Sequence, residues 1–170
     1  FVLIDINTLS TLPKREMIAG FAEILKYSLI LDKKFFNWLN INGEKILKKS
    51  PNIISDAIYR SCKHKAHVVK KDEKEKNLRA ILNFGHTFAH AIETICGYSK
   101  KIIHGEAVLI GMIIAARLSN QMGYLKKNEL KDILSLYKKL NLNFNYKKFV
   151  NLKNVKKVFK IMNNDKKSNG

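Results

Sequence analysis

Helical periodicity is the feature that most constrains the fold of this chain. Apolar residues recur with helical spacing in nearly every segment after residue 6, and the alternation typical of strands is almost absent there. The run FVLIDI over residues 1–6 has β-type composition and is predicted as a short strand. The rest predicts an all-α fold. The helices are expected over residues 14–31, 33–40, 51–69, 78–95, 105–123, 127–140 and 152–162.

Three segments are predicted to separate or end these helices. Asn42-Gly43 is expected to break the second helix, because glycine and asparagine disfavour a helix interior. The charged run over residues 70–77 is predicted as an exposed connection, and Gly97 as the residue that closes the helix over 78–95.

Positive charge is the strongest compositional signal, with a formal net charge of +18. A basic helical nucleic-acid-binding module is therefore one alternative. Lysine supplies 28 of the 32 positive charges, however, and arginine, the residue preferred for phosphate and base contacts, supplies four. The lysines are dispersed without interleaved aromatic residues, and their A/T-rich codons explain the surplus. Nucleic acid is therefore not expected as a partner.

Membrane and secretory segments are not expected either. The longest apolar run, Ala107–Ala116, is shorter than the roughly 20 residues that a membrane helix needs. The start at Phe1 shows no basic region or cleavage site of a secretory signal. Cys62 and Cys96 lie far apart and outside any CxxC spacing, and are expected to be buried thiols in a reducing compartment. These features predict a cytoplasmic protein.

Polar residues on otherwise apolar helices are the strongest functional signal. The helix over 78–95 is apolar in most directions, and its polar exceptions are Arg79, Asn83, His86 and His90. At about 100° per residue, these four fall within roughly 60° of one another. Such a stripe predicts the lining of a site, and a set of satisfied buried polar groups is the alternative.

Two further places carry candidate ligands of a metal ion. Glu23 and Lys26 lie one turn apart, which by itself predicts only an ion pair, and His104-Gly105-Glu106 begins an apolar helix. Two imidazoles and a carboxylate are a recognised zinc set. Because His86 and His90 are also spaced to share one ion, spacing alone does not choose the ligands. Glu75 lacks an apolar frame and by pattern is solvated.

Three sequence runs carry a resemblance to a known family. The runs LIDINTLSTLPKREMIAGFAEILKY, DEKEKNLRAILNFGHTFAHAIE and HGEAVLIGM closely resemble the C-terminal half of 3-dehydroquinate synthases, in the same order, and the likeness covers residues 1–167. The resemblance implies conversion of 3-deoxy-D-arabino-heptulosonate 7-phosphate to 3-dehydroquinate and phosphate, in the shikimate pathway. It also implies NAD, a divalent metal (zinc or cobalt) and a homodimer of the full-length protein. Another sugar-phosphate cyclase of the superfamily is the alternative.

The resemblance also implies the roles of individual residues. The metal ligands correspond to Glu23, His86 and His104. The catalytic residues correspond to Lys26, Glu75 and His90, which revises the solvated interpretation of Glu75. The substrate-binding residues correspond to Lys65, Arg79, Asn83 and Lys166, with Lys167 as the alternative to the last. The segment that touches NAD corresponds to Thr8, Leu9, Ser10 and Thr11.

The domain organisation follows from the same resemblance. Residues 1–7 are expected to be the remnant of an N-terminal α/β domain that binds NAD, and residues 8–170 the helical domain that binds metal and substrate. Because the Gly-rich NAD site of the family is not in these residues, the chain alone is expected to be inactive.

Overall fold

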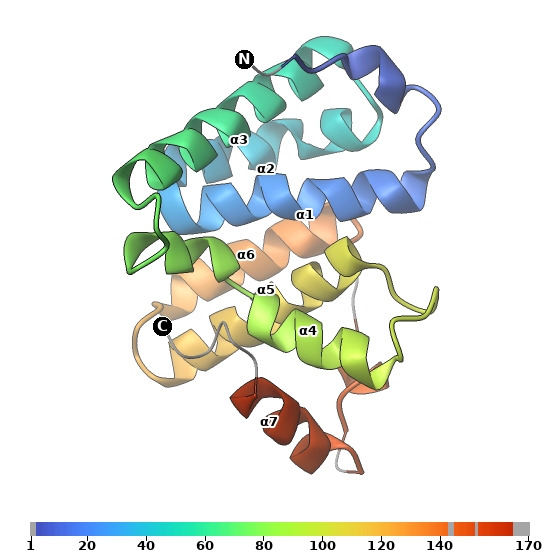
Figure 1. Cartoon of the computed structure of the whole chain (residues 1–170). Helices are drawn as coiled ribbons and strands as arrows, with labels where there is room; N and C mark the ends of the chain where they lie inside the picture. The colour runs from blue at the N-terminus through green and yellow to red at the C-terminus, as the bar shows by residue number, and fades with distance from the viewer. Residues whose placement is uncertain (1–2, 143–144, 152, 165–170) are drawn as a thin grey trace.

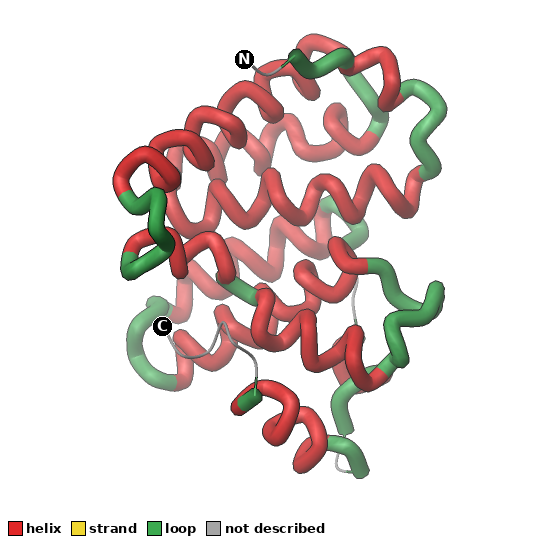
Figure 2. Tube along the Cα trace, in the orientation of Figure 1, coloured by secondary structure: helices red, strands yellow, loops and turns green. Residues whose placement is uncertain are grey.

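A computed structural model describes residues 3–142, 145–151 and 153–164 of the chain, and it is all-α over these residues. Figure 2 shows helices and loops, with no strand in the described segments. In chain order the elements are η1 (Ile6–Leu9), α1 (Lys14–Leu31), α2 (Lys33–Leu47), α3 (Pro51–Lys71), η2 (Leu78–Asn83), α4 (His86–Ile95), α5 (His104–Gln121), α6 (Lys127–Lys139), η3 (Tyr146–Lys148) and α7 (Val155–Asn163).

The expected N-terminal strand is wrong for residues 3–6, and residues 1 and 2 lie outside the described part. Residues 3–5 are irregular, and Ile6–Leu9 forms a 3₁₀ turn. Asp5 makes this turn, because its carboxylate accepts from the Asn7 N–H (2.9 Å) and its carbonyl from the Thr8 hydroxyl (2.7 Å). Local hydrogen bonds therefore replace the strand pairing that the apolar composition predicted.

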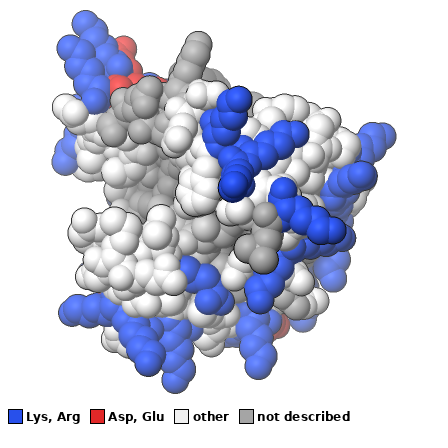
Figure 3. Space-filling view, turned by 90° about the horizontal axis from the view of Figure 1, so that it is seen from below, with Lys and Arg blue, Asp and Glu red and all other residues white. Residues whose placement is uncertain are grey.

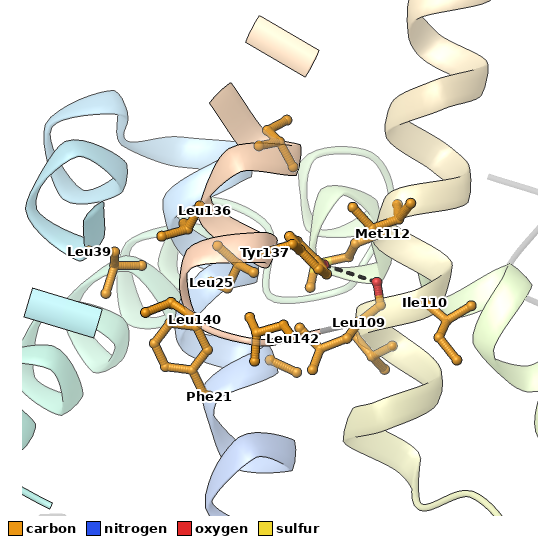
Figure 4. Packing of buried hydrophobic residues seen from close by; sticks show 14 of the residues in the cluster. Phe21, Leu25, Leu39, Leu109, Ile110, Met112, Leu136, Tyr137, Leu140 and Leu142 are labelled. Carbon is orange, nitrogen blue, oxygen red and sulfur yellow. Dashed lines mark hydrogen bonds between the residues drawn. The ribbon is translucent and has the colours of Figure 1, made fainter. Parts of the chain in front are cut away.

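The hydrophobic core lies between α1, α2, α5 and α6 (Figure 4). Phe21 and Leu25 of α1 and Leu109 of α5 are essentially inaccessible to solvent. The Tyr137 hydroxyl of α6 donates to the Leu109 carbonyl (2.9 Å), and burial raises the pKa of Tyr137, so the hydroxyl remains a neutral donor. This core fixes α1 and α5 relative to each other.

The predicted break at Asn42-Gly43 is wrong, because α2 continues to Leu47. Gly43 is buried, and a Cβ atom there would lie 2.7 Å from the Cδ1 atom of Leu140. The glycine therefore permits close packing of α2 against the end of α6 instead of ending the helix.

The predicted continuous helix over 78–95 is also wrong. Gly85 adopts a left-handed conformation (φ 81°) and separates η2 from α4. A Cβ at Gly85 would lie 2.7 Å from the Met112 backbone nitrogen, so α5 approaches too closely for any other residue. The predicted stripe is thus divided, with Arg79 and Asn83 on η2 and His86 and His90 on α4.

The other helices agree with their predicted ranges to within a few residues. Gly97 follows α4 in the left-handed conformation (φ 64°), as predicted. α7 packs beneath α4 in the view of Figure 1. The expectation of two buried thiols is wrong for Cys62, which is exposed on α3, whereas Cys96 is partly buried. In the described part of the chain, no helix combines the length and apolar character needed to span a membrane.

Candidate functional site

Three histidines from α4 and α5 gather beside α1. The ring centroids of His86 and His90 are 5.8 Å apart, and those of His86 and His104 are 5.4 Å apart. The rings of His90 and His104 are stacked at 6.2 Å. The spacing of residues within α4 and the packing of α4 on α5 therefore bring together imidazoles that are up to 18 positions apart in the sequence.

α1 supplies a carboxylate and an ammonium group to the same cluster. Glu23 Oε1 lies 3.9 Å from His86 Nε2, and Glu23 Oε2 lies 2.7 Å from the Lys26 Nζ. The Lys26 side chain is buried, with its ammonium 5.5 Å from the centre of the Tyr27 ring. Lys26 is thus a fixed positive charge held by one carboxylate and one aromatic face.

His86 is neutral at physiological pH. The pKa of His86 is lowered to about 4, and burial is the largest cause. The positive charge of Lys26 also lowers this pKa, by more than the carboxylate of Glu23 raises it. A neutral imidazole has a free lone pair on one ring nitrogen, which is the form that binds metal ions.

The donor set of Glu23, His86 and His104 fits zinc or cobalt in its chemistry. Two ligands of one tetrahedral zinc ion lie about 3.3 Å apart, close to the 3.9 Å between Glu23 and His86. Among the described residues, no group of three or more His, Cys, Asp and Glu side chains has converged to metal-binding geometry. The second oxygen of Glu23 is bonded to Lys26 instead.

Both candidate histidines present Nδ1 to an oxygen atom. His86 Nδ1 lies 3.4 Å from the Phe84 carbonyl, and His104 Nδ1 lies 3.1 Å from Glu93 Oε1. When Nδ1 carries the proton in such contacts, Nε2 keeps the lone pair. This pattern is typical of metal-binding histidines, whose other nitrogen donates to a carboxylate or a carbonyl.

Close packing holds the start of α5, where His104 lies, against α1. A Cβ atom at Gly105 would lie 2.3 Å from the Ala19 carbonyl oxygen, so only glycine permits this approach of α5 to α1. Arg15 of α1 bonds to both carboxylate oxygens of Glu106 (2.7 and 2.6 Å). Burial raises the pKa of Glu106, but the bonds from Arg15 and the Ile103 N–H outweigh it and leave the pKa below its usual value. The start of α5 is therefore clamped to α1.

Glu75 and Arg79 lie together on the connector between α3 and α4. Asp72 folds this connector, because its carboxylate accepts from the backbone N–H groups of Lys76, Asn77 and Arg79, each at 2.9 Å. The Arg79 Nε lies 3.7 Å from Glu75 Oε2, and about half of the Glu75 side chain is exposed. The predicted exposed connection is confirmed, although α3 extends to Lys71.

The remaining predicted residues lie around this group. Asn83 lines a cavity of about 460 Å³ that Ile30 and Phe84 also line. Lys65 is exposed on α3. Residues 8–11 follow or form part of η1, above α1 in Figure 1, whereas α4 lies below α1. Lys166 and Lys167 lie outside the described residues.

The structure adds Glu93 to the predicted cluster. Glu93 lies seven residues after His86 and three after His90, on the same face of α4, so helical spacing alone contains this signal. It contacts His104 and, with His90, Thr94 and Tyr98, lines a pocket of about 590 Å³. Polar side chains therefore line an open pocket beside the histidines.

A solved structure with the same fold gives the class of protein. The 2-epi-5-epi-valiolone synthase of Streptomyces hygroscopicus subsp. jinggangensis, solved with NAD⁺ and Zn²⁺ bound, matches 94% of this chain with a TM-score of 0.80 and 26% identity. The chain covers 43% of that structure. The all-α fold thus matches part of a sugar-phosphate cyclase.

Sequence comparison identifies the family within this class. The family described as 3-dehydroquinate synthase C-terminal matches residues 20–168. The 3-dehydroquinate synthase of Thermodesulfovibrio yellowstonii is 51% identical over 144 residues, which are 85% of this chain and 40% of the relative. That of Pelagibacter ubique is 48% identical over 168 residues, 99% of this chain and 46% of the relative. The chain belongs to the 3-dehydroquinate synthase family, and it spans less than half the length of these relatives.

Proposed function

We propose that the full-length protein is a 3-dehydroquinate synthase, which converts 3-deoxy-D-arabino-heptulosonate 7-phosphate to 3-dehydroquinate and phosphate. The observation that carries the proposal is the convergence of Glu23, Lys26, His86 and His104 from α1, α4 and α5 in a chain of this family. The residues of this domain would bind and orient the substrate, whereas NAD would supply the hydride acceptor.

Glu23, His86 and His104 would hold the divalent metal ion. A bound zinc or cobalt ion supplies Lewis-acid stabilisation of a substrate oxygen that loses its proton. The neutral state of His86 supports this role, because a protonated imidazole cannot coordinate. Lys26, already buried beside Glu23, would keep a positive charge next to the same substrate oxygen.

The basic and polar residues would bind the acidic groups of the substrate. Arg79, Lys65, Asn83 and Lys166 are assigned by family resemblance to the carboxylate and phosphate, where charge-assisted hydrogen bonds are strong. Arg79 is held by Glu75 and the Glu73 carbonyl, so its guanidinium is oriented before substrate binds. His90, half-buried beside His86 and His104, would transfer a proton at the substrate.

The test is turnover and metal content of the full-length protein. We expect it to release phosphate from 3-deoxy-D-arabino-heptulosonate 7-phosphate and to form 3-dehydroquinate, with NAD and Co²⁺ or Zn²⁺ added. Glu23→Ala and His86→Ala should each abolish metal binding and turnover. Glu44→Ala, which changes an exposed glutamate of α2, is the matched control and should retain both.

Two outcomes would overturn the proposal in different ways. A His86→Ala protein that keeps both its metal and its turnover would refute the ligand set. Turnover of another phosphorylated sugar in place of the heptulosonate would assign the protein to another cyclase activity, which the fold shared with 2-epi-5-epi-valiolone synthase makes the second candidate.

A further inference from the structure

We propose that Glu93 is a positioning residue that fixes the ring orientation and tautomer of His104. The inference rests on the proposed function, because it gives the proposed metal ligand His104 a partner. Its central observation is the contact of 3.1 Å between Glu93 Oε1 and His104 Nδ1, across the α4–α5 interface.

The two partners differ in how firmly the protein holds them. The Glu93 side chain is 12% exposed, whereas the His104 side chain is 53% exposed. An exposed imidazole at the first residue of a helix has several accessible rotamers. The mostly buried carboxylate is therefore the fixed member of the pair, and it selects one rotamer of the mobile ring.

The contact also selects one tautomer of His104. A carboxylate accepts hydrogen bonds and does not donate them, so in a neutral His104 ring this contact places the proton on Nδ1 and leaves the lone pair on Nε2. The Phe84 carbonyl lies in the same relation to Nδ1 of His86. Both candidate imidazole ligands therefore present the same nitrogen, and in each case an oxygen atom of η2–α4 faces the other nitrogen.

The backbone of His104 is fixed by a separate set of contacts. Arg15 bonds to Glu106 and to the carbonyls of Lys100 and Lys101 (3.0 and 3.3 Å), and Gly105 packs on Ala19. This clamp sets where α5 begins but not which way the imidazole turns. The ring also lies beside the rings of His86 and His90, but its hydrogen-bond contact is with Glu93, which therefore sets its orientation and tautomer.

The experiment compares Glu93→Ala, Glu93→Gln and the control Glu44→Ala in the full-length protein. Zn²⁺ and Co²⁺ affinities are measured by competition with a chromogenic chelator. We expect Glu93→Ala to weaken metal binding by about 10- to 100-fold. Glu93→Gln, which keeps an oxygen acceptor at the same position, should restore most of the affinity, and Glu44→Ala should match the unmodified protein.

A second readout reports the ring itself and would not change through a merely structural role. In the metal-free protein, ¹⁵N chemical shifts should show His104 in the Nδ1–H form, and Glu93→Ala should shift it toward the Nε2–H form. An unmodified protein with His104 in the Nε2–H form, or a Glu93→Ala protein with unchanged affinity and tautomer, would overturn the inference. If His86→Ala retains metal while His104 still responds to Glu93, the metal site fails and the positioning contact stands.

Discussion

The burial of His86 couples the stability of the metal-free protein to pH. The pKa of His86 falls from an ordinary value of 6.5 to about 4 on folding, first through burial and then through the charge of Lys26. Below pH 6.5 the unfolded chain therefore binds a proton that the folded chain does not. This group therefore leaves the free energy of unfolding unchanged above pH 6.5. Between pH 6.5 and pH 4 the free energy of unfolding decreases, by about 3 kcal/mol over the whole range.

Urea unfolding of the metal-free protein at pH 7.5 and pH 4.5 measures this coupling. His86→Gln removes the titrating group, so its loss of stability between these pH values should be smaller than that of the unmodified protein by about 2 kcal/mol. His67→Gln, which changes an exposed histidine of α3, is the control and should keep the original dependence. Equal pH dependence in all three proteins would contradict the assigned pKa.

Residue motifs predicted much of the candidate cluster, and geometry explains what they left out. Glu23 lies beside Lys26 and His86, and the ring centroids of His86, His90 and His104 lie within 6.2 Å of one another. The spacing of Glu23 and Lys26 predicted their ion pair, and the structure confirms it. The sequence could not show that His104 turns toward Glu93, because that contact depends on how α5 packs against α4. The roles of these residues stay predictions.

At the scale of elements, the crossing of α5 on α1 depends on one glycine. Gly105→Ala would place a Cβ 2.3 Å from the Ala19 carbonyl, and because that atom belongs to the backbone, the helices must separate. We expect a loss of about 3 kcal/mol in the free energy of unfolding, together with weaker metal binding as Glu23 and His104 move apart.

Gly20→Ala is the matched control for that substitution. Gly20 lies on α1, one residue after Ala19, and a Cβ there would meet no atom within 4 Å. Alanine has the higher helix propensity, so this variant should gain up to about 1 kcal/mol. Thermal unfolding of both variants checks the pair, and a Gly105→Ala protein as stable as Gly20→Ala would show that α5 does not pack as described.

The connector between α3 and η2 depends on one carboxylate. Hydrogen bonds from Arg79, Lys76 and Asn77 lower the pKa of Asp72, so its contribution to stability is present above its unfolded pKa and is lost as pH falls through the folded one. Asp72→Ala should increase hydrogen exchange of the amides of residues 76–79, whereas Asp56→Ala on α3 should leave it unchanged. Unaltered exchange in Asp72→Ala would contradict this role.

Periodicity predicted the helices but not the effect of two glycines. The sequence predicts a break at Gly43, where the helix continues, and a helix interior at Gly85, which instead separates η2 from α4. In both cases a glycine is needed because a residue of another element packs closely against it. Leu140 lies against Gly43, and Met112 lies against Gly85. Glycine permits a close approach in either conformation, so local propensity cannot predict which of the two occurs.

At the scale of the whole molecule, the lysines that give the net charge of +18 are dispersed along the sequence. On the face shown in Figure 3, Lys and Arg side chains project in several directions, with uncharged surface between them. Affinity for nucleic acid depends on how many phosphates a protein neutralises together, and each contact steepens the dependence on salt. Dispersed lysines engage few phosphates of one duplex at a time.

The prediction is weak and non-specific binding of DNA and RNA. In filter binding with the full-length protein, retention at 150 mM salt should be close to background, and at lower salt the slope of log K against log [salt] should correspond to about two or three phosphate contacts. A nucleic-acid-binding protein of similar net charge serves as the positive control. A slope that corresponds to six or more contacts, with retention at 150 mM salt, would show that the lysines act together and would favour the binding-module alternative.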